Sequence, residues 1–312
     1  MSKYVFGVDI GGTTIKLGLF TVTGELVEKF AIDTEIGDKL LPNTANAILA
    51  KLAERGLTIA DLAGVGVGVP GPVNEEGTVL IGVNIGWDNP VAVKKELSTL
   101  LGVSVEVTND ANIAAVGEMW LGAAKGVNSA IMFTLGTGVG GGVIVDGKVI
   151  NGCNGAGGEI GHITVVTDDS AITCGCGKTG CLETVTSATG IVRLASEVLL
   201  NSEQPSTLRN LAEITAKAVF DEAKAGDELA LALVDKVGYY LGLASANLAA
   251  TIDPELFIFG GGVSHAGDIL LDAIRKHYIK FSFSSIRQTP FVLATLGNDA
   301  GIIGGAYLAT HS

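Results

Sequence analysis

The sequence has few basic residues, few cysteines and no long apolar run. Lysine and arginine total 20 among 312 residues, against 33 aspartates and glutamates, which gives a formal net charge of -13. Binding to a nucleic-acid backbone needs clustered positive charge, so this balance argues against a nucleic-acid partner. The N-terminal residues lack the apolar core of a signal peptide, and no apolar segment is expected to span a bilayer. We therefore expect a cytoplasmic protein that binds neither nucleic acid nor membrane.

Three of the four cysteines are gathered within eight positions, and one of only four histidines lies upstream of them. A reducing compartment disfavours a disulfide framework, which leaves metal binding or simple burial as the roles of these thiols. Burial as structural thiols is the alternative, but the flanking glycines provide little side chain to bury them. Three thiolates and one imidazole form a standard closed zinc set. The pattern predicts a structural zinc held by His162, Cys174, Cys176 and Cys181, and leaves Cys153 as a buried structural thiol.

Two glutamates flank this cluster, Glu159 three residues before His162 and Glu183 two residues after Cys181. A histidine that binds metal through one ring nitrogen carries its proton on the other, aimed in a fixed direction. A folded zinc loop is expected to place both carboxylates beside that ring. The alternative is a pair of solvated surface glutamates, which their apolar, glycine-rich context disfavours. Such a set of acceptors and one donor suits a polyhydroxylated ligand.

Two segments have the pattern of a strand, a glycine-rich turn and a second strand. The first covers residues 4–20, and the amides of its turn can face one concavity that an anion could enter. The second covers residues 131–145, with Thr134 where the first has Asp9. This repetition predicts two related lobes with ligands between them.

Two other glycine motifs are rejected. Residues 136–141 satisfy the dinucleotide fingerprint, but that fingerprint requires a helix next, and strand-like runs around Asp146 and Gly147 follow instead. Residues 177–179 imitate the end of a P-loop, but the earlier glycine is missing and cysteines bracket them.

Asn109 and Asp110 lie between a strand over residues 103–108 and a helix over residues 111–124. Capping of that helix would by itself explain both side chains. In an α/β fold, however, ligands lie beyond the C-terminal ends of strands, and a helix dipole would keep Asp110 ionised. An ionised carboxylate in that position could act as a general base.

The rest of the chain is expected to be scaffold and loops. A composition of 47% hydrophobic and 17% charged residues allows a large core and two domains. Loops are expected at residues 70–73 and 84–87, and a triple glycine follows a buried strand at 256–259. Apolar periodicity predicts helices over residues 43–55, 90–101, 184–200, 207–225, 227–250, 267–277 and 299–308.

The element Glu-x-Gly-His followed by Cys-x-Cys-Gly-x-x-Gly-Cys-x-Glu resembles the signature of the ROK family of bacterial sugar kinases and repressors. Every fixed position of that signature is met between Glu159 and Glu183. The surrounding runs, residues 155–164 and 183–190, are most similar to the glucokinases of the family. The resemblance extends over essentially the whole chain.

The resemblance implies an α/β, actin-like (ribonuclease H-like) fold with two lobes. The smaller lobe is expected to comprise residues 1–120 plus 298–312, and the larger residues 121–297. By similarity, Asp110 is the catalytic base, and the sugar is bound by Gly71, Asn84, Asn109, Asp110, Glu159, His162 and Glu183. The nucleotide positions implied are Asp9, Gly11, Gly12, Thr13, Thr14, Lys16, Thr137, Gly138, Gly261, Gly262 and Val263.

The activity implied is transfer of the γ-phosphoryl group of ATP to the 6-hydroxyl of glucose, with Mg²⁺ near Asp9 and a structural Zn²⁺. The resemblance also implies a homodimer or homotetramer, because relatives often form such assemblies. Two alternatives stay open. One is a kinase for another hexose, such as fructose, mannose, N-acetylmannosamine or N-acetylglucosamine. The other is a sugar-sensing repressor of the same family without its DNA-binding segment, which the acidic chain and the three residues before the first strand disfavour.

Overall fold

The computed structural model describes residues 3–311, apart from the side chain of Val83. Its contacts divide the chain into two compact units. Unit 1 comprises Met1–Gly126, Gly142–Gly158 and Leu296–Ser312, and unit 2 comprises Val127–Gly141 and Glu159–Thr295. This division differs from the expected lobe boundaries mainly in the segment Gly142–Gly158, which packs with unit 1.

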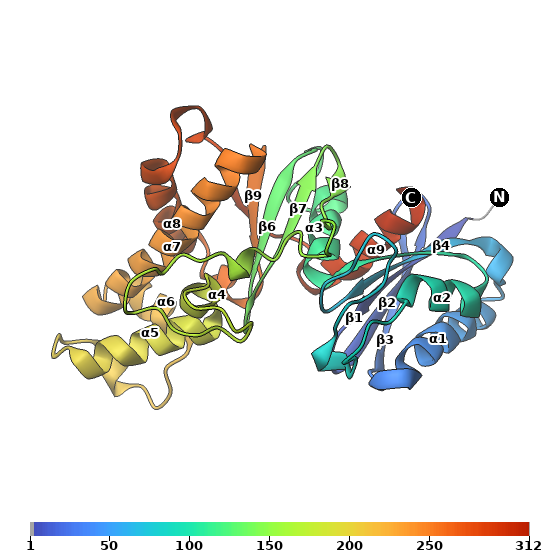
Figure 1. Ribbon diagram of the computed structural model, residues 1–312, viewed down its shortest axis with the longest axis horizontal. Coiled ribbons are helices and arrows are strands. Elements are labelled where there is room, and N and C mark those ends of the chain that lie inside the picture. Colours follow the sequence, from blue (N-terminus) through green and yellow to red (C-terminus); the bar gives the residue numbers. More distant parts are fainter. Residues whose placement is uncertain (1–2, 312) are drawn as a thin grey trace. The chain divides into compact units, whose positions relative to one another are not determined.

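Unit 1 is built on a five-stranded sheet of order β3-β2-β1-β4-β5. Figure 1 labels β1 to β4 of this sheet. The pairs β1–β2 and β2–β3 are antiparallel, whereas β1–β4 and β4–β5 are parallel. The strands are β1 (Tyr4–Ile10), β2 (Thr14–Thr21), β3 (Leu26–Asp33), β4 (Leu62–Val69) and β5 (Ser104–Asn109). The expected glycine hairpin is confirmed as β1–β2.

Helices cover both faces of this sheet: α1 (Leu40–Glu54), α2 (Val93–Leu101), α3 (Asp110–Leu121) and α9 (Ala300–His311). Side chains alternate along a strand, so Phe6 and Val8 share a core with α1 and α2, whereas Val5 packs with Ile302 of α9. Gly7 lies on the α9 side, and a Cβ there would come within 1.7 Å of the Ile302 carbonyl oxygen. The backbone of α9 therefore rests directly on β1.

The second sheet has the order β10-β9-β6-β7-β8, and the division between units falls inside β7. β9 is parallel to β6 and β10, and β7 is antiparallel to β8. A turn with positive φ at Asp146 and Gly147 connects β7 to β8, so the rejection of a dinucleotide helix at this point is confirmed. The strands are β6 (Ala130–Leu135), β7 (Val139–Val145), β8 (Lys148–Val149), β9 (Leu256–Gly260) and β10 (Phe291–Leu293).

Unit 2 contains the remaining α-helices: α4 (Glu183–Thr186), α5 (Ala188–Asn201), α6 (Ala216–Lys224), α7 (Glu228–Ile252) and α8 (Asp268–Phe281). Within residues 3–311, α7 alone is long and apolar enough to cross a membrane, but 61% of its most apolar window is buried. Gly238 and Gly242 bring its backbone close to Ala273 and Tyr278 of α8. This burial is typical of a core helix.

Two expected helices are interrupted. Ser187 is extended and caps α5 by accepting from the Gly190 amide, which separates α4 from α5. The helix expected over 207–225 is wrong in its first half, where a short 3-10 helix (Thr207–Asn210) is followed by irregular chain. Thr215 then caps α6 by accepting from the Ala218 amide. These hydroxyls offer the backbone an alternative to continuous helix, which apolar periodicity does not register.

Further 3-10 helices cover Gly37–Lys39, Ile59–Asp61, Val83–Ile85, Ile160–His162, Gly262–Ala266, Ser284–Ile286 and Gly297–Asp299.

Candidate functional site

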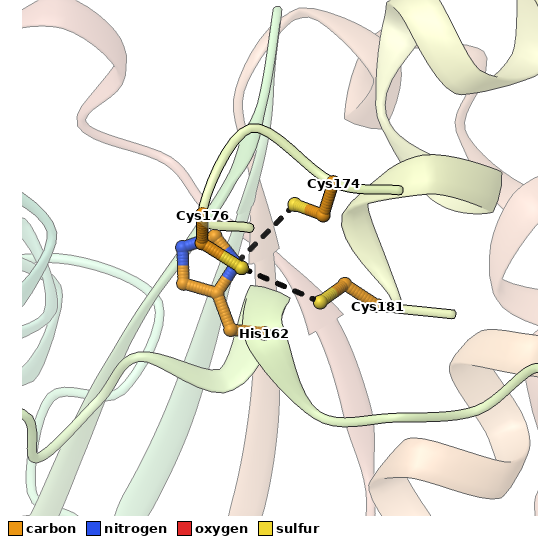
Figure 2. Close-up of side chains that lie close together, drawn as sticks. All are labelled: His162, Cys174, Cys176 and Cys181. Atoms are coloured by element: carbon orange, nitrogen blue, oxygen red, sulfur yellow. Dashed lines mark hydrogen bonds between the residues drawn. The ribbon is translucent and has the colours of Figure 1, made fainter. Parts of the chain in front are cut away.

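The four predicted metal ligands converge in unit 2, with all ligand atoms within 4.8 Å of one another (Figure 2). Cys176 Sγ lies 3.7 Å from Cys181 Sγ, and Cys174 Sγ lies 3.7 Å from His162 Nδ1. A tetrahedral zinc with bonds of about 2.3 Å to sulfur and about 2.0 Å to nitrogen holds its ligand atoms roughly 3.5 to 3.8 Å apart. The donor set fits zinc, the two shortest distances match a tetrahedral site, and four protein ligands would complete the coordination of the ion.

The chain around the thiols folds into tight turns that bring the ligands together. The Cys174 amide donates to Lys178 O at 2.7 Å, and Gly177 adopts a positive φ between them. Burial raises the pKa of the Cys174 thiol to about 12. Because the metal ligand is a thiolate, binding of zinc here must release protons. Cys153 is exposed, so its expected role as a buried thiol is wrong.

The histidine ring presents its two nitrogens to different groups. Nδ1 faces Cys174, and Nε2 lies 3.8 Å from Glu159 Oε2. Metal binding through Nδ1 would therefore leave the Nε2 proton directed toward the Glu159 side. Both side chains retain exposed area, His162 at 31% and Glu159 at 40%. This pair can reach a ligand that carries hydroxyl groups.

Glu183 is half-buried, and its carboxylate contacts Val139 and Cys174. Its Oε2 accepts from the Val139 amide at 2.9 Å, at the start of β7. Its Oε1 lies 3.4 Å from Cys174 Sγ. The carboxylate therefore lies between the metal cluster and the β6–β7 turn.

The β6–β7 turn borders a cavity of about 500 Å³ in unit 2. Thr137, Gly262 and Val263 line it, so the structure brings these three sequence-predicted positions together. Gly261 shapes the turn behind them, because its φ is +83° and a Cβ would come within 2.5 Å of Leu135 O. The volume is in the range of small-molecule sites. Sequence reasoning missed the α6 side of the cavity, formed by Ala216, Lys217, Phe220, Asp221 and Lys224.

The β1–β2 turn in unit 1 is fixed by hydrogen bonds within the turn and from Thr34. The Gly11 amide donates to Thr14 O at 3.0 Å, and Thr34 binds Gly11 O and Thr13 O. Gly12 and Thr13 are exposed. A turn of this kind can bind an anion through its amides.

Asp9 lies at the base of that turn. Desolvation raises the pKa of the Asp9 carboxyl, and Lys16, with Nζ at 3.7 Å, opposes the shift without cancelling it. Lys16 also donates to Asn298 O at 3.4 Å. A carboxylate whose negative charge is incompletely balanced fits a hard cation such as Mg²⁺.

The end of β5 carries the two side chains whose roles the sequence left open. Asn109 caps α3, because its Oδ1 accepts from the amides of Ala111 at 2.8 Å and Asn112 at 3.3 Å. Its Nδ2 donates to Gly71 O at 3.1 Å. Asp110 is exposed, and its Oδ1 accepts from the Ala111 amide at 2.8 Å. Asn109 is therefore the N-cap of α3, and the Asp110 carboxylate shares the Ala111 amide with it.

Gly71 lies in a loop of unit 1, whereas Asn84, expected in a loop, lies in the short 3-10 helix Val83–Ile85. Gly71 has a φ of +106°, and a Cβ would come within 2.1 Å of Ile81 O, so no other residue fits. Asn84 is exposed, and its carbonyl oxygen is 3.2 Å from the position of a Cβ on Gly12. Asn84 therefore lies beside the β1–β2 turn.

A buried amide network supports the start of α3, and sequence reasoning missed it. Asn112 donates through Nδ2 to Asn151 Oδ1 and Gly157 O, both at 3.3 Å. Thr108 donates to the same Asn151 oxygen at 2.8 Å. Asn112 is 2% exposed, and its Oδ1 has no hydrogen-bond partner among the described residues. This network ties the segment 151–157 to the helix that begins at Asp110.

Comparisons with known proteins show the family to which the chain belongs. The family model described as the ROK family matches residues 5–312. The chain is 46% identical to a glucokinase of Halalkalibacterium halodurans, over 98% of this chain and 94% of the relative, and 38% identical to a glucokinase of Thermotoga maritima, over 97% and 96%. Among solved structures, the ROK family glucokinase of Streptomyces griseus in complex with glucose and AMPPNP is 34% identical, with a TM-score of 0.75 over 99% of this chain and all of that one.

These matches extend over nearly the full length of the chain, and the two sheets are those of the actin-like sugar kinases, as the resemblance implied. The chain therefore belongs to the ROK family.

Proposed function

We propose that the protein is a glucokinase that transfers the γ-phosphoryl group of ATP to the 6-hydroxyl of glucose. The names of its relatives support this activity, at 46% and 38% identity over almost the whole chain. The mechanism rests on one observation at the end of β5: Asn109 is the N-cap of α3, and the neighbouring Asp110 is exposed. An exposed carboxylate at the N-terminus of a helix can accept the proton of an attacking hydroxyl.

The remaining roles follow from the chemistry of each group. Phosphoryl transfer depends on positioning and on offsetting phosphate charge, more than on covalent chemistry by the protein. Amides of Gly12, Thr13 and Thr14, with Lys16, can bind phosphate oxygens in unit 1, whereas the Gly11 amide donates to Thr14 O and shapes the turn that presents them. Thr137 and Gly138 are proposed to do so in unit 2, with Gly261, Gly262 and Val263 at the adenosine. The sugar hydroxyls are assigned to Gly71, Asn84, Asn109, Glu159, His162 and Glu183.

Two metal ions are part of the proposal. Magnesium, bound with ATP near Asp9, would supply positive charge that offsets the phosphates. Zinc would be structural, because His162, Cys174, Cys176 and Cys181 fill its coordination. Bound to zinc through Nδ1, the His162 ring would be fixed, and its Nε2–H could donate a hydrogen bond to a sugar oxygen.

The test is release of ADP by the purified protein over a panel of sugars at equal concentrations: glucose, fructose, mannose, N-acetylmannosamine and N-acetylglucosamine. We expect glucose to give the highest kcat/KM, and phosphorus NMR should show the product phosphorylated at the 6-hydroxyl. A higher kcat/KM for another sugar would identify the enzyme as a kinase for that hexose. Glucose binding without turnover of any sugar would instead favour the sugar-sensing alternative.

A further inference from the structure

The β6–β7 turn of unit 2 is held by the segment that follows the last metal-binding cysteine. Three hydrogen bonds reach it from Glu183, Ala188 and Thr189. The Val139 amide donates to Glu183 Oε2 at 2.9 Å. The Ala188 amide donates to Gly136 O at 2.8 Å, and Thr189 Oγ1 donates to Thr137 O at 2.9 Å. The shape of this turn therefore depends on where residues 183–189 lie.

Glu183 alone among these three residues also contacts a metal-binding side chain. Its Oε1 is 3.4 Å from Cys174 Sγ, and the ligand Cys181 precedes it by two residues. The intervening Leu182 amide donates to Ile163 O at 2.8 Å, next to the ligand His162. The start of α4 is thus anchored to both sides of the cluster.

The turn packs directly on the Glu183 carboxylate. A Cβ on Gly138 would come within 2.4 Å of Glu183 Oε2, so the turn and the carboxylate can approach only because residue 138 is glycine. Movement of Glu183 by a fraction of an ångström would change this contact and the Val139 hydrogen bond together. Such a short connection can transmit the order of the metal loop to the turn.

We propose that Glu183 is a positioning residue that couples the metal cluster to the β6–β7 turn, so that zinc occupancy sets the affinity for nucleotide phosphates. The inference rests on the proposed role of this turn in nucleotide binding. It adds to the proposed role of Glu183 as a sugar ligand, because a role confined to the sugar would change glucose affinity and leave nucleotide affinity unchanged. His162 would then connect the metal cluster to the sugar, and Glu183 would connect it to the nucleotide as well as to the sugar.

The experiment measures Mg²⁺–ADP binding by calorimetry in the absence of sugar, so that its readout is independent of turnover. Glu183→Ala removes the acceptor of the Val139 amide. We expect it to weaken ADP binding by roughly tenfold or more, as for loss of one hydrogen bond to a charged group. Glu183→Gln retains an oxygen acceptor and should stay within about threefold of wild type. Normal ADP affinity of Glu183→Ala, combined with weakened glucose binding, would overturn the proposal.

Removal of zinc by a chelator, followed by restoration with Zn²⁺ alone, tests the coupling itself. We expect zinc removal to weaken ADP binding in wild type and to have little further effect in Glu183→Ala, because coupled perturbations are not additive. The matched control is Thr189→Val, which loses the neighbouring bond to Thr137 but leaves Glu183 in place. Its ADP affinity should fall, and the effect of zinc removal should persist.

Two results would contradict the coupling: ADP affinity that does not change when zinc is removed from wild type, or an equal zinc effect in wild type and Glu183→Ala. If Glu183→Ala does not fold, Glu183→Asp replaces it, because its shorter side chain cannot keep the contacts with both Cys174 and Val139 and should lose most of the zinc effect. Wild type that binds no ADP at all would overturn the proposed kinase function and this inference together.

Discussion

Replacement of Asp110 by asparagine separates catalysis from capping at the end of β5. The substitution keeps the side-chain shape and an oxygen that can accept from the Ala111 amide, as Asp110 Oδ1 does at 2.8 Å. The helix cap stays intact, because Asn109 provides it with bonds of 2.8 and 3.3 Å. What is removed is the negative charge and the ability to take a proton.

The loss of stability and the loss of kcat expected for Asp110→Asn differ in size. Loss of one acidic charge in the first turn of α3 should lower stability by no more than about 1 kcal/mol. Loss of a general base should lower kcat by roughly 10² to 10⁴, which corresponds to about 3 to 5 kcal/mol in the barrier. Asn109→Ala is the matched control, because it removes the cap and the bond to Gly71 O and should cost about 1 to 2 kcal/mol of stability.

The assay is ADP release at saturating glucose and ATP, with glucose affinity measured by calorimetry and stability by urea unfolding. We expect Asp110→Asn to retain glucose affinity and stability while its kcat falls. A kcat near that of wild type would remove Asp110 as the base. A loss of activity that weakened glucose binding fully explains would instead make Asp110 a binding residue.

Three further changes test other parts of the molecule. Cys176→Ser should lose zinc, thermal stability and glucose affinity together; elemental analysis that finds no zinc in purified wild type would contradict the metal assignment. Asp9→Asn should abolish most activity yet raise the melting temperature near pH 7. The folded-state pKa of Asp9 lies above the ordinary value of 3.8, so its ionised form destabilises the fold above that raised pKa. The gain in melting temperature of Asp9→Asn over wild type should therefore vanish as the pH falls below 3.8. A gain that is unchanged at low pH would refute the burial argument. Gly7→Ala should destabilise unit 1 by more than about 3 kcal/mol in urea unfolding, because the new methyl would overlap the Ile302 carbonyl at 1.7 Å; a near-wild-type midpoint would show that α9 can move away.

Features set by local sequence could be predicted well. The alternation of side chains around Phe6 and the glycines after it predict the β1–β2 hairpin, which the structure confirms. The spacing of three cysteines and a histidine predicts the ligand cluster, and their ligand atoms converge as expected. The hairpin is formed by residues that are close in the chain. The cluster could be predicted because three cysteines and a histidine at this spacing have few roles other than metal binding.

Features set by long-range packing could not be predicted in the same way. The α6 helix has ordinary amphipathic periodicity, and nothing in residues 216–224 indicates that Lys217 and Lys224 border a cavity with Gly262. Asn112 looks like any polar residue in a helix. Its partner Asn151 lies 39 positions away, and only the fold brings the two together.

Glu183 shows where inference from spacing ends. Two residues after a metal ligand, its carboxylate was expected beside the histidine ring, and that spacing does place it at the edge of the cluster, 3.4 Å from Cys174 Sγ. Its second oxygen is directed by the sheet, which brings the Val139 amide to it from 44 positions away. A carboxylate has two oxygens and can serve two neighbours at once. Sequence therefore predicts that Glu183 belongs to a ligand site, whereas the contact with Val139 decides which substrate its loss should affect first.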